Sequence, residues 1–142
     1  MIGDPVAGAG VWAPRAHAVL RVVAGLEFLQ HGTAKYLKFP VVPMYADFQP
    51  MSPAGVAGVF ELLGSVLLIL GLFTRTAAFF MSGVMAVGYF LVHYPRGFYP
   101  ILNDGELAVL YCFVFLFFAV AGPGAWSLDG LRQRHHRRWR PL

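Results

Sequence analysis

The feature that most constrains this chain is a set of four apolar stretches along its 142 residues. They cover residues 16–35, 54–72, 76–94 and 105–121. Each is close to the ~20 residues that an α-helix needs to cross the ~30 Å hydrocarbon layer of a membrane. The pattern therefore predicts an all-α protein, a bundle of four transmembrane helices.

The composition excludes an ordinary soluble domain. Hydrophobic residues make up 58% of the chain and charged residues 13%, against about 45–50% and about 25% in soluble proteins. A soluble fold of this length has too little interior to bury the excess. One domain is expected, a membrane domain over residues 16–131 in contact with the lipid bilayer, preceded by a segment at 1–15 and followed by a tail at 132–142.

Helix-breaking residues mark the ends of the stretches. Pro14 is expected just before the first helix, and Ser52 with Pro53 can cap the second. Pro95 is expected to stop the third helix, because proline has no N–H for the next hydrogen bond. The connection at 73–75 is so short that the second and third helices must be antiparallel neighbours.

The distribution of Lys and Arg predicts the orientation. With four crossings, one side holds Arg15, Arg75 and five arginines of the tail, and the other side holds Lys35, Lys38 and Arg96. Seven basic residues against three place both termini in the cytoplasm. We therefore expect a multi-pass protein of the cell inner or plasma membrane, with cytoplasmic segments at 1–15 and 132–142.

The basic tail admits two interpretations. A run of arginines can bind nucleic acid, but directly after a membrane helix it more commonly contacts anionic lipid and fixes the orientation. We adopt the lipid interpretation and expect no nucleic-acid partner. Residues 1–15 lack the basic segment and short apolar run of a cleaved signal peptide.

Ionisable residues inside the apolar stretches are the candidate functional residues, because a charge at membrane depth is costly and marks a functional site by default. Glu27, His31 and Lys35 are spaced four residues apart, so they form one column on the first helix. The connectivity brings the other candidates to the same, outer half of the bundle. The predicted pocket contains Glu27, Gln30, His31, Lys35, Glu61, His93 and Glu106.

Several kinds of chemistry fit such a pocket. His and carboxylate groups can hydrogen-bond a quinone and exchange protons with it, which is the interpretation we favour. A metal ion or a haem held by His31 and His93 is less well supported, because the spacing matches no metal motif. The carboxylates can also be structural, paired with His and Lys between helices. No catalytic residue and no metal ligand is assigned, and Cys112 alone forms no redox pair.

Several short segments resemble the DoxX family of membrane proteins. The first-helix segment 25–35 ends in the His-Gly-x-x-Lys element of that family, and 61–64 with 70–75 is similar to its second helix and turn. Residues 95–98, 103–106 and 122–129 look like its third loop, fourth-helix start and C-terminal signature. Together these matches lie in order over about residues 15 to 131.

The resemblance implies a four-helix membrane protein with a redox connection. Some relatives are associated with thiosulfate:quinone oxidoreduction or with membrane oxidoreductase complexes, and more distant ones are assembly or cargo proteins. We therefore predict a component of a membrane redox complex with redox-protein partners, an oxidoreductase subunit whose pocket binds quinone. The alternative is a non-catalytic scaffold or assembly factor. A proton-coupled transporter is disfavoured because no half of the chain is duplicated, and helix glycines leave a homo-oligomer open.

Overall fold

The computed structural model describes residues 5–138, and the side chains of residues 10–133. Across that range it has five α-helices and no strand, which confirms the all-α class. The helices are α1 (Pro5–Tyr36), α2 (Pro53–Leu70), α3 (Thr74–Gly88), α4 (Glu106–Ala121) and α5 (Leu128–Arg138). Residues 1–4 and 139–142, which include the ends of both predicted cytoplasmic segments, lie outside the described residues.

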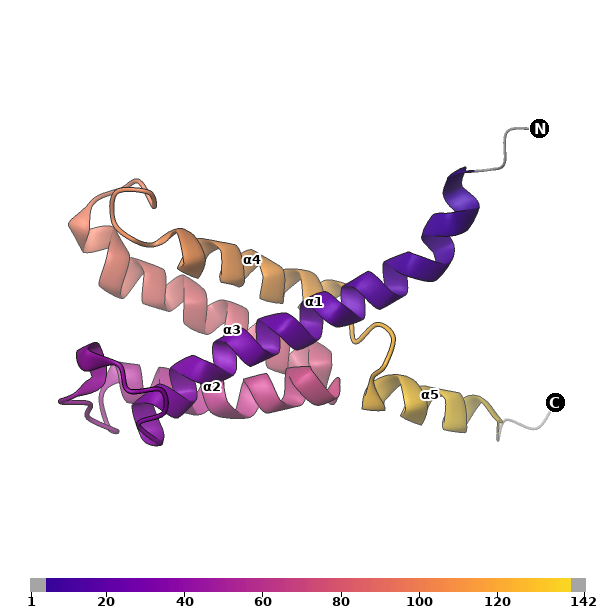
Figure 1. The fold of residues 1–142 in the computed structure, drawn as a ribbon, viewed down its shortest axis with the longest axis horizontal. Helices are drawn as coiled ribbons and strands as arrows, with labels where there is room; N and C mark the ends of the chain where they lie inside the picture. The colour runs from indigo at the N-terminus through magenta and orange to yellow at the C-terminus, as the bar shows by residue number, and fades with distance from the viewer. Residues whose placement is uncertain (1–4, 139–142) are drawn as a thin grey trace.

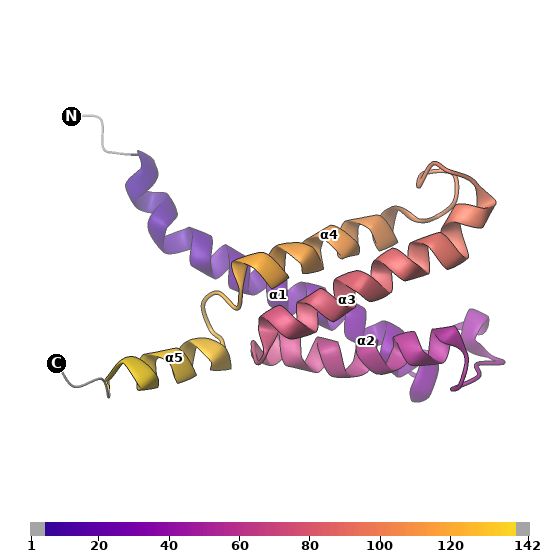
Figure 2. The same cartoon turned by 180° about the vertical axis from the view of Figure 1, so that it is seen from behind.

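Helices α1 to α4 run alternately up and down in two layers (Figures 1 and 2). Helix α1 packs along α2, and α3 packs along α4, while α2 and α3 join the two layers. We call the end formed by residues 37–52 and 97–105 the loop end. The opposite end, formed by the turn at 71–73 and residues 122–127, is the terminal end. Helix α5 leaves the terminal end as a separate element (Figure 1).

The first helix begins earlier than predicted. Helix α1 starts at Pro5, and Pro14 lies inside it rather than before it. Proline lacks an N–H and crowds the preceding turn, so it bends a helix that continues through it. The N-terminal part of α1 does bend away from the bundle (Figure 1). Pro14 thus marks a change of direction and not a helix start.

The third helix also ends differently from the prediction. Regular α-helix stops at Gly88, and the chain continues as a π-turn at Tyr89–His93 and a 3-10 turn at Tyr94–Arg96. Pro95 lies within this last turn, and the Tyr94 N–H bonds to the Tyr89 carbonyl. A wider turn followed by a tighter one accommodates a proline that a regular α-helix excludes.

The second helix has the predicted start. Ser52 is its N-cap, and the Ser52 hydroxyl accepts a hydrogen bond of 3.2 Å from the Gly55 N–H. Pro53 follows in the first turn. By length and composition, the segments Pro53–Leu70 and Thr74–Arg96 can each cross a membrane, and the shorter helix Glu106–Ala121 is also apolar.

The interior of the bundle is small and aromatic. Phe28 of α1 packs edge-on against Phe115 of α4, with the ring centroids 4.9 Å apart. Leu68 and Met81 complete this core from α2 and α3. Large apolar side chains elsewhere point outward, such as Leu63, Phe79 and Phe113, which are 62–64% exposed. An apolar exterior of this kind suits a lipid environment.

Gly71 ends α2 in a left-handed backbone conformation and in a crowded position. Its φ is +63°, and an added Cβ would lie 2.4 Å from Cβ of Ser127. We expect Gly71→Ala to lower the free energy of unfolding by at least about 1–2 kcal/mol, because the left-handed backbone alone disfavours alanine by that amount. Chemical denaturation in detergent micelles measures the difference.

Gly83→Ala is the matched control for that prediction. Gly83 lies inside α3, and nothing lies within 4 Å of the Cβ that it would gain. Alanine there is expected to be neutral or to stabilise the helix by up to about 1 kcal/mol. Equal effects of the two substitutions would show that the turn at Gly71 is not under steric constraint.

Candidate functional site

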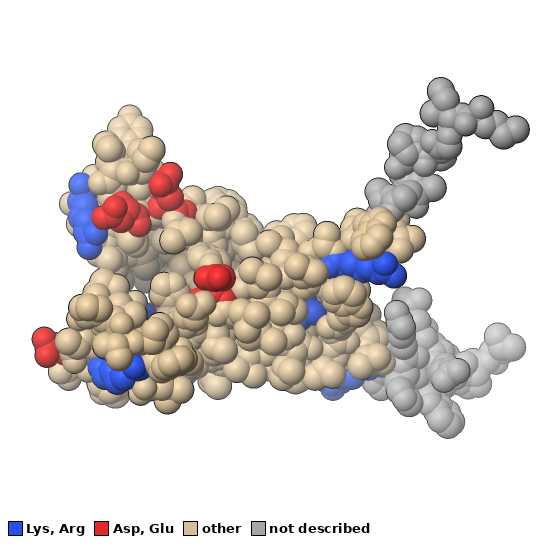
Figure 3. Space-filling view, viewed as in Figure 1, with Lys and Arg blue, Asp and Glu red and all other residues tan. Residues whose placement is uncertain are grey.

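The two helix layers separate toward the loop end. The backbones of α1 and α4 approach each other over only a short stretch. Between them, Phe28 of α1 contacts Tyr111 and Phe115 of α4. Toward the loop end the space-filling view shows a hollow between the two arms of the molecule (Figure 3). We call this hollow the loop-end opening.

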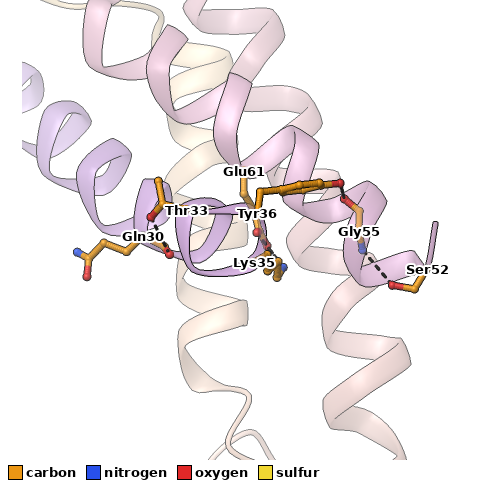
Figure 4. Close-up of polar contacts among 7 residues, drawn as sticks. All are labelled: Gln30, Thr33, Lys35, Tyr36, Ser52, Gly55 and Glu61. Atoms are coloured by element: carbon orange, nitrogen blue, oxygen red, sulfur yellow. Dashed lines mark hydrogen bonds and ion pairs between the residues drawn. The ribbon is translucent and has the colours of Figure 1, made fainter. Parts of the chain in front are cut away.

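Lys35 and Glu61 form a buried ion pair between α1 and α2. The Lys35 Nζ donates to both carboxylate oxygens of Glu61, at 2.6 Å and 2.8 Å. The two residues are only 6% and 3% exposed. Figure 4 shows the two side chains meeting between the helices. Because both charges are removed from solvent, each depends on the other for its compensation.

The loop at 37–52 covers this ion pair. The Lys35 ammonium lies 5.4 Å from the centre of the Tyr45 ring, and Lys38 donates to the Tyr45 carbonyl at 2.7 Å. The Tyr36 hydroxyl donates to the Gly55 carbonyl at 2.9 Å (Figure 4). Burial, and secondarily the negative charge of Glu61, raise the pKa of the Tyr45 phenol. Tyr45 therefore covers the pair as a neutral phenol.

Glu27 and His31 lie on α1 on either side of Phe28 in the sequence. Both side chains are exposed. The centroid of the His31 ring is 5.6 Å from that of Phe28. Within residues 10–133, no hydrogen bond or ion pair engages the side chain of either residue. These two groups are available to a ligand.

The other sequence-predicted residues are placed apart from that pair. Gln30 is exposed on α1 and points away from Lys35 and Glu61 (Figure 4). His93 follows α3, and its Nδ1 is 3.0 Å from the Asn103 carbonyl. Glu106 is exposed in the first turn of α4. The seven predicted residues are thus divided among an ion pair, the α1 face of the opening and the α3–α4 layer.

Asn103 was not singled out in the sequence, yet it organises the loop at 97–105. It is 1% exposed, and its amide donates to the Gly97 carbonyl at 2.7 Å and to the Tyr89 hydroxyl at 3.3 Å. Its side-chain oxygen accepts from the Gly105 N–H at 2.9 Å. The His93 contact to its carbonyl therefore belongs to a structural network.

Arg21 is the most deeply buried charged residue of the described chain, at 0% exposed. Its guanidinium donates to the Leu68 and Ile69 carbonyls at the end of α2, and to the Ala125 and Trp126 carbonyls beyond α4. A guanidinium group is suited to bonding several carbonyls at once, because its N–H donors point in several fixed directions. The sequence signal was an arginine within the first apolar stretch.

Asp129 also links the segment that follows α4 to the turn between α2 and α3. Its two carboxylate oxygens accept hydrogen bonds of 3.0 Å each from the Phe73 and Thr74 N–H groups, where α3 begins. The Asp129 N–H donates to the Gly71 carbonyl at 2.9 Å. A carboxylate at a helix N-terminus is favourable, since it pairs with free N–H groups. Together Arg21 and Asp129 fasten residues 122–129 to the turn between α2 and α3.

The donor set favours an organic ligand over a metal ion. Among the residues that the structure describes, no three His, Cys, Asp or Glu side chains come together as metal ligands. Where α1 meets α4, the structure instead has one aromatic ring, Tyr111, with one imidazole and one carboxylate nearby on α1. That combination can stack against a flat ring and hydrogen-bond polar atoms at its edge.

Known proteins show similarity over most of the chain. The DoxX family model matches residues 16–94. A Haemophilus influenzae protein, named only as an uncharacterized protein, is 48% identical over 122 residues, covering 83% of this chain and 91% of that protein. The inner membrane protein YqjF of Escherichia coli is 28% identical over 122 residues, covering 80% and 88% respectively. No solved structure matches the chain.

Proposed function

This chain belongs to the DoxX family of membrane proteins, and from that premise we propose that it crosses the membrane four times and binds a quinone in its loop-end opening. The protein would act as a component of a membrane redox complex. The observation that carries the binding proposal is the pair Glu27 and His31, exposed next to the Phe28–Tyr111 ring pair and without partners among residues 10–133.

The alternating helices support the proposal of four crossings, and the charge distribution supports the orientation. Helices α1 to α4 alternate in direction, so the loop end and the terminal end would lie on opposite sides of the membrane (Figure 1). The terminal end carries Arg15, Arg75 and the basic tail, and the loop end carries Lys35, Lys38 and Arg96. The Lys and Arg excess at the terminal end favours cytoplasmic termini.

The ligand chemistry follows from the groups around the opening. A quinone ring can stack on the half-buried Tyr111, while His31 donates a hydrogen bond to one ring carbonyl. Reducing a quinone to a quinol adds two electrons and two protons. Glu27 and His31 are titratable groups that can pass the protons, and a redox protein of the complex would supply the electrons.

The buried ion pair has a supporting role in this proposal. Lys35 and Glu61 neutralise each other one turn beyond His31, so they add no net charge next to the opening. They also hold α1 against α2, which fixes the face that α1 presents to α4. Glu27 and His31 are thereby positioned by groups that need not touch the ligand.

Quinone binding tests the proposal directly. We expect the purified protein in nanodiscs to bind menaquinone or ubiquinone saturably, and His31→Ala to weaken binding at least tenfold, the value of one charged hydrogen bond of about 1.5 kcal/mol. Asp47→Asn is the control, because Asp47 is an exposed polar residue on the loop at 37–52. Absence of saturable binding, or equal losses in the two variants, would refute the site.

A scaffold function is the second candidate, and α5 is the observation that favours it. This helix is polar and stands apart from the bundle, yet Asp129 fastens its first turn to α3. A helix held in this way can present itself to a partner protein. A partner that co-purifies with the full chain and is lost on deletion of residues 130–142, with quinone binding absent, would favour the scaffold.

A further inference from the structure

We propose that α1 carries, at the terminal end, a binding site for one anionic phospholipid. The site is an apolar groove of about 540 Å³ between one face of α1 and the loop that follows α4. We call it the α1 groove. It is lined by Trp12, Arg15, Ala16, Val19, Leu20, Val23 and Trp126.

The polarity of the groove changes along α1 as it does along a phospholipid. Trp12 and Arg15 lie toward the terminal end, and the Arg15 guanidinium is 5.1 Å from the centre of the Trp12 ring. Val19 and Val23 lie deeper, toward the middle of the bundle. From Trp12 to Val23 the helix rises about 16 Å at 1.5 Å per residue, which accommodates most of an acyl chain.

Tryptophans flank the polar part of the groove. Trp12 and Trp126 are each 66% exposed, and they come from segments far apart in the sequence. Tryptophan side chains prefer the headgroup level of a membrane, where one part of the ring is apolar and the other is hydrated. With α1 crossing the membrane as proposed above, the two rings and the Arg15 guanidinium lie where a lipid phosphate would be.

The charge around the groove favours an anionic lipid over a zwitterionic one. Arg15, Arg75 and Arg132 are exposed at the terminal end. Among the described residues, Asp129 is the acidic side chain at this end, and it is engaged by two backbone N–H groups. In Figure 3 the acidic side chains gather over the loop end and the middle of the molecule. An anionic headgroup would therefore meet uncompensated positive charge.

A second copy of this chain is a poorer occupant of the groove. Two copies that met through it would bring their exposed arginines together, and like charges oppose such a contact. A phospholipid brings a negative charge and a flexible apolar chain, which match Arg15 and the aliphatic part of the groove.

Native mass spectrometry of the full chain released from detergent micelles tests the proposal. Phosphatidylglycerol and phosphatidylcholine with identical acyl chains are the probes. We expect one phosphatidylglycerol to be retained saturably and in preference to phosphatidylcholine. Arg15→Gln is expected to weaken phosphatidylglycerol retention about fivefold, since one basic residue near the membrane surface contributes about that factor, and to leave phosphatidylcholine unchanged.

Two further variants distinguish binding in the α1 groove from a nonspecific attraction of anionic lipid to the basic terminal end. Arg132→Gln removes the same charge at the same end but outside the groove, near Phe73, so it should weaken retention less than Arg15→Gln does. Leu20→Trp fills the aliphatic part and should weaken both lipids. Equal retention of the two lipids, equal losses in Arg15→Gln and Arg132→Gln, or a dimer in place of a lipid adduct would overturn the proposal. Loss of quinone binding would not, because the two sites lie at opposite ends.

Discussion

Glu61→Gln is expected to lower the free energy of unfolding by about 3–5 kcal/mol, the range for removing one partner of a buried ion pair. The substitution keeps the shape of the side chain but leaves the Lys35 ammonium buried without its carboxylate. The cost comes from the uncompensated charge and not from lost packing. Chemical denaturation in detergent micelles, followed by tryptophan fluorescence, measures it.

A double substitution separates the charge from the contact. Lys35→Met combined with Glu61→Met removes both charges and fills the same space, so it should recover most of the stability. Glu106→Gln is the matched control, because Glu106 is an exposed glutamate at the same end of the bundle, and it should change stability by no more than about 0.5 kcal/mol. If Glu61→Gln were as mild as Glu106→Gln, the pair would not hold α1 against α2.

Arg21→Met is expected to destabilise the protein by about 3 kcal/mol or more. The guanidinium bonds to carbonyls of two segments, α2 at Leu68 and Ile69 and the loop at 125–126. Hydrogen bonds to a charged group each contribute about 1.5–3 kcal/mol. Not all of the carbonyls left without the guanidinium find another hydrogen-bond donor. Arg21→Lys should rescue only part of the loss, since one ammonium cannot reach both segments.

Limited proteolysis shows where the effect of Arg21→Met occurs. Release of the loop should speed cleavage within residues 122–127 relative to the loop at 37–52. Arg96→Met is the control, because Arg96 is exposed and only pairs with the exposed Asp104 at 3.6 Å, a contact of small value. Unchanged cleavage of 122–127 in Arg21→Met would contradict the role assigned to the guanidinium.

Local signals in the sequence predicted much of the fold. The apolar stretches correspond to the four packed helices, because a run of such length has few other stable conformations in an apolar environment. Ser52 and Pro53 start α2 as predicted, since a cap depends on only the next few residues. Pro14 was misleading because a helix long enough to extend past the bundle tolerates a bend.

The candidate site was harder to predict, because residues that are aligned along one helix need not contact the same neighbours. Glu27, His31 and Lys35 are four residues apart, and each step of four rotates about 40° beyond a full turn. Over two steps the drift is large enough that Glu27 is exposed beside the opening while Lys35 turns inward to Glu61. The spacing of these residues along α1 does not reveal against which of them α2 packs.

The remaining features depend on tertiary contacts that no local pattern encodes. Helix α5 is polar, and its first turn is defined by Asp129 bonding to a turn 55 and 56 residues away in sequence. Asn103 resembles any loop asparagine until its amide is seen to bond to Gly97 and Tyr89. Such residues become recognisable only when distant segments are brought together.

Arg21 also has a consequence for how the protein is made. Two of its carbonyl partners belong to residues 104 and 105 positions later in the chain. During synthesis, Arg21 is therefore made long before two of its acceptors have been translated. Until residues 125–126 have been added, the guanidinium can bond only to the carbonyls of α2. A chain that stops before residue 125 lacks the link between α1 and the loop that follows α4.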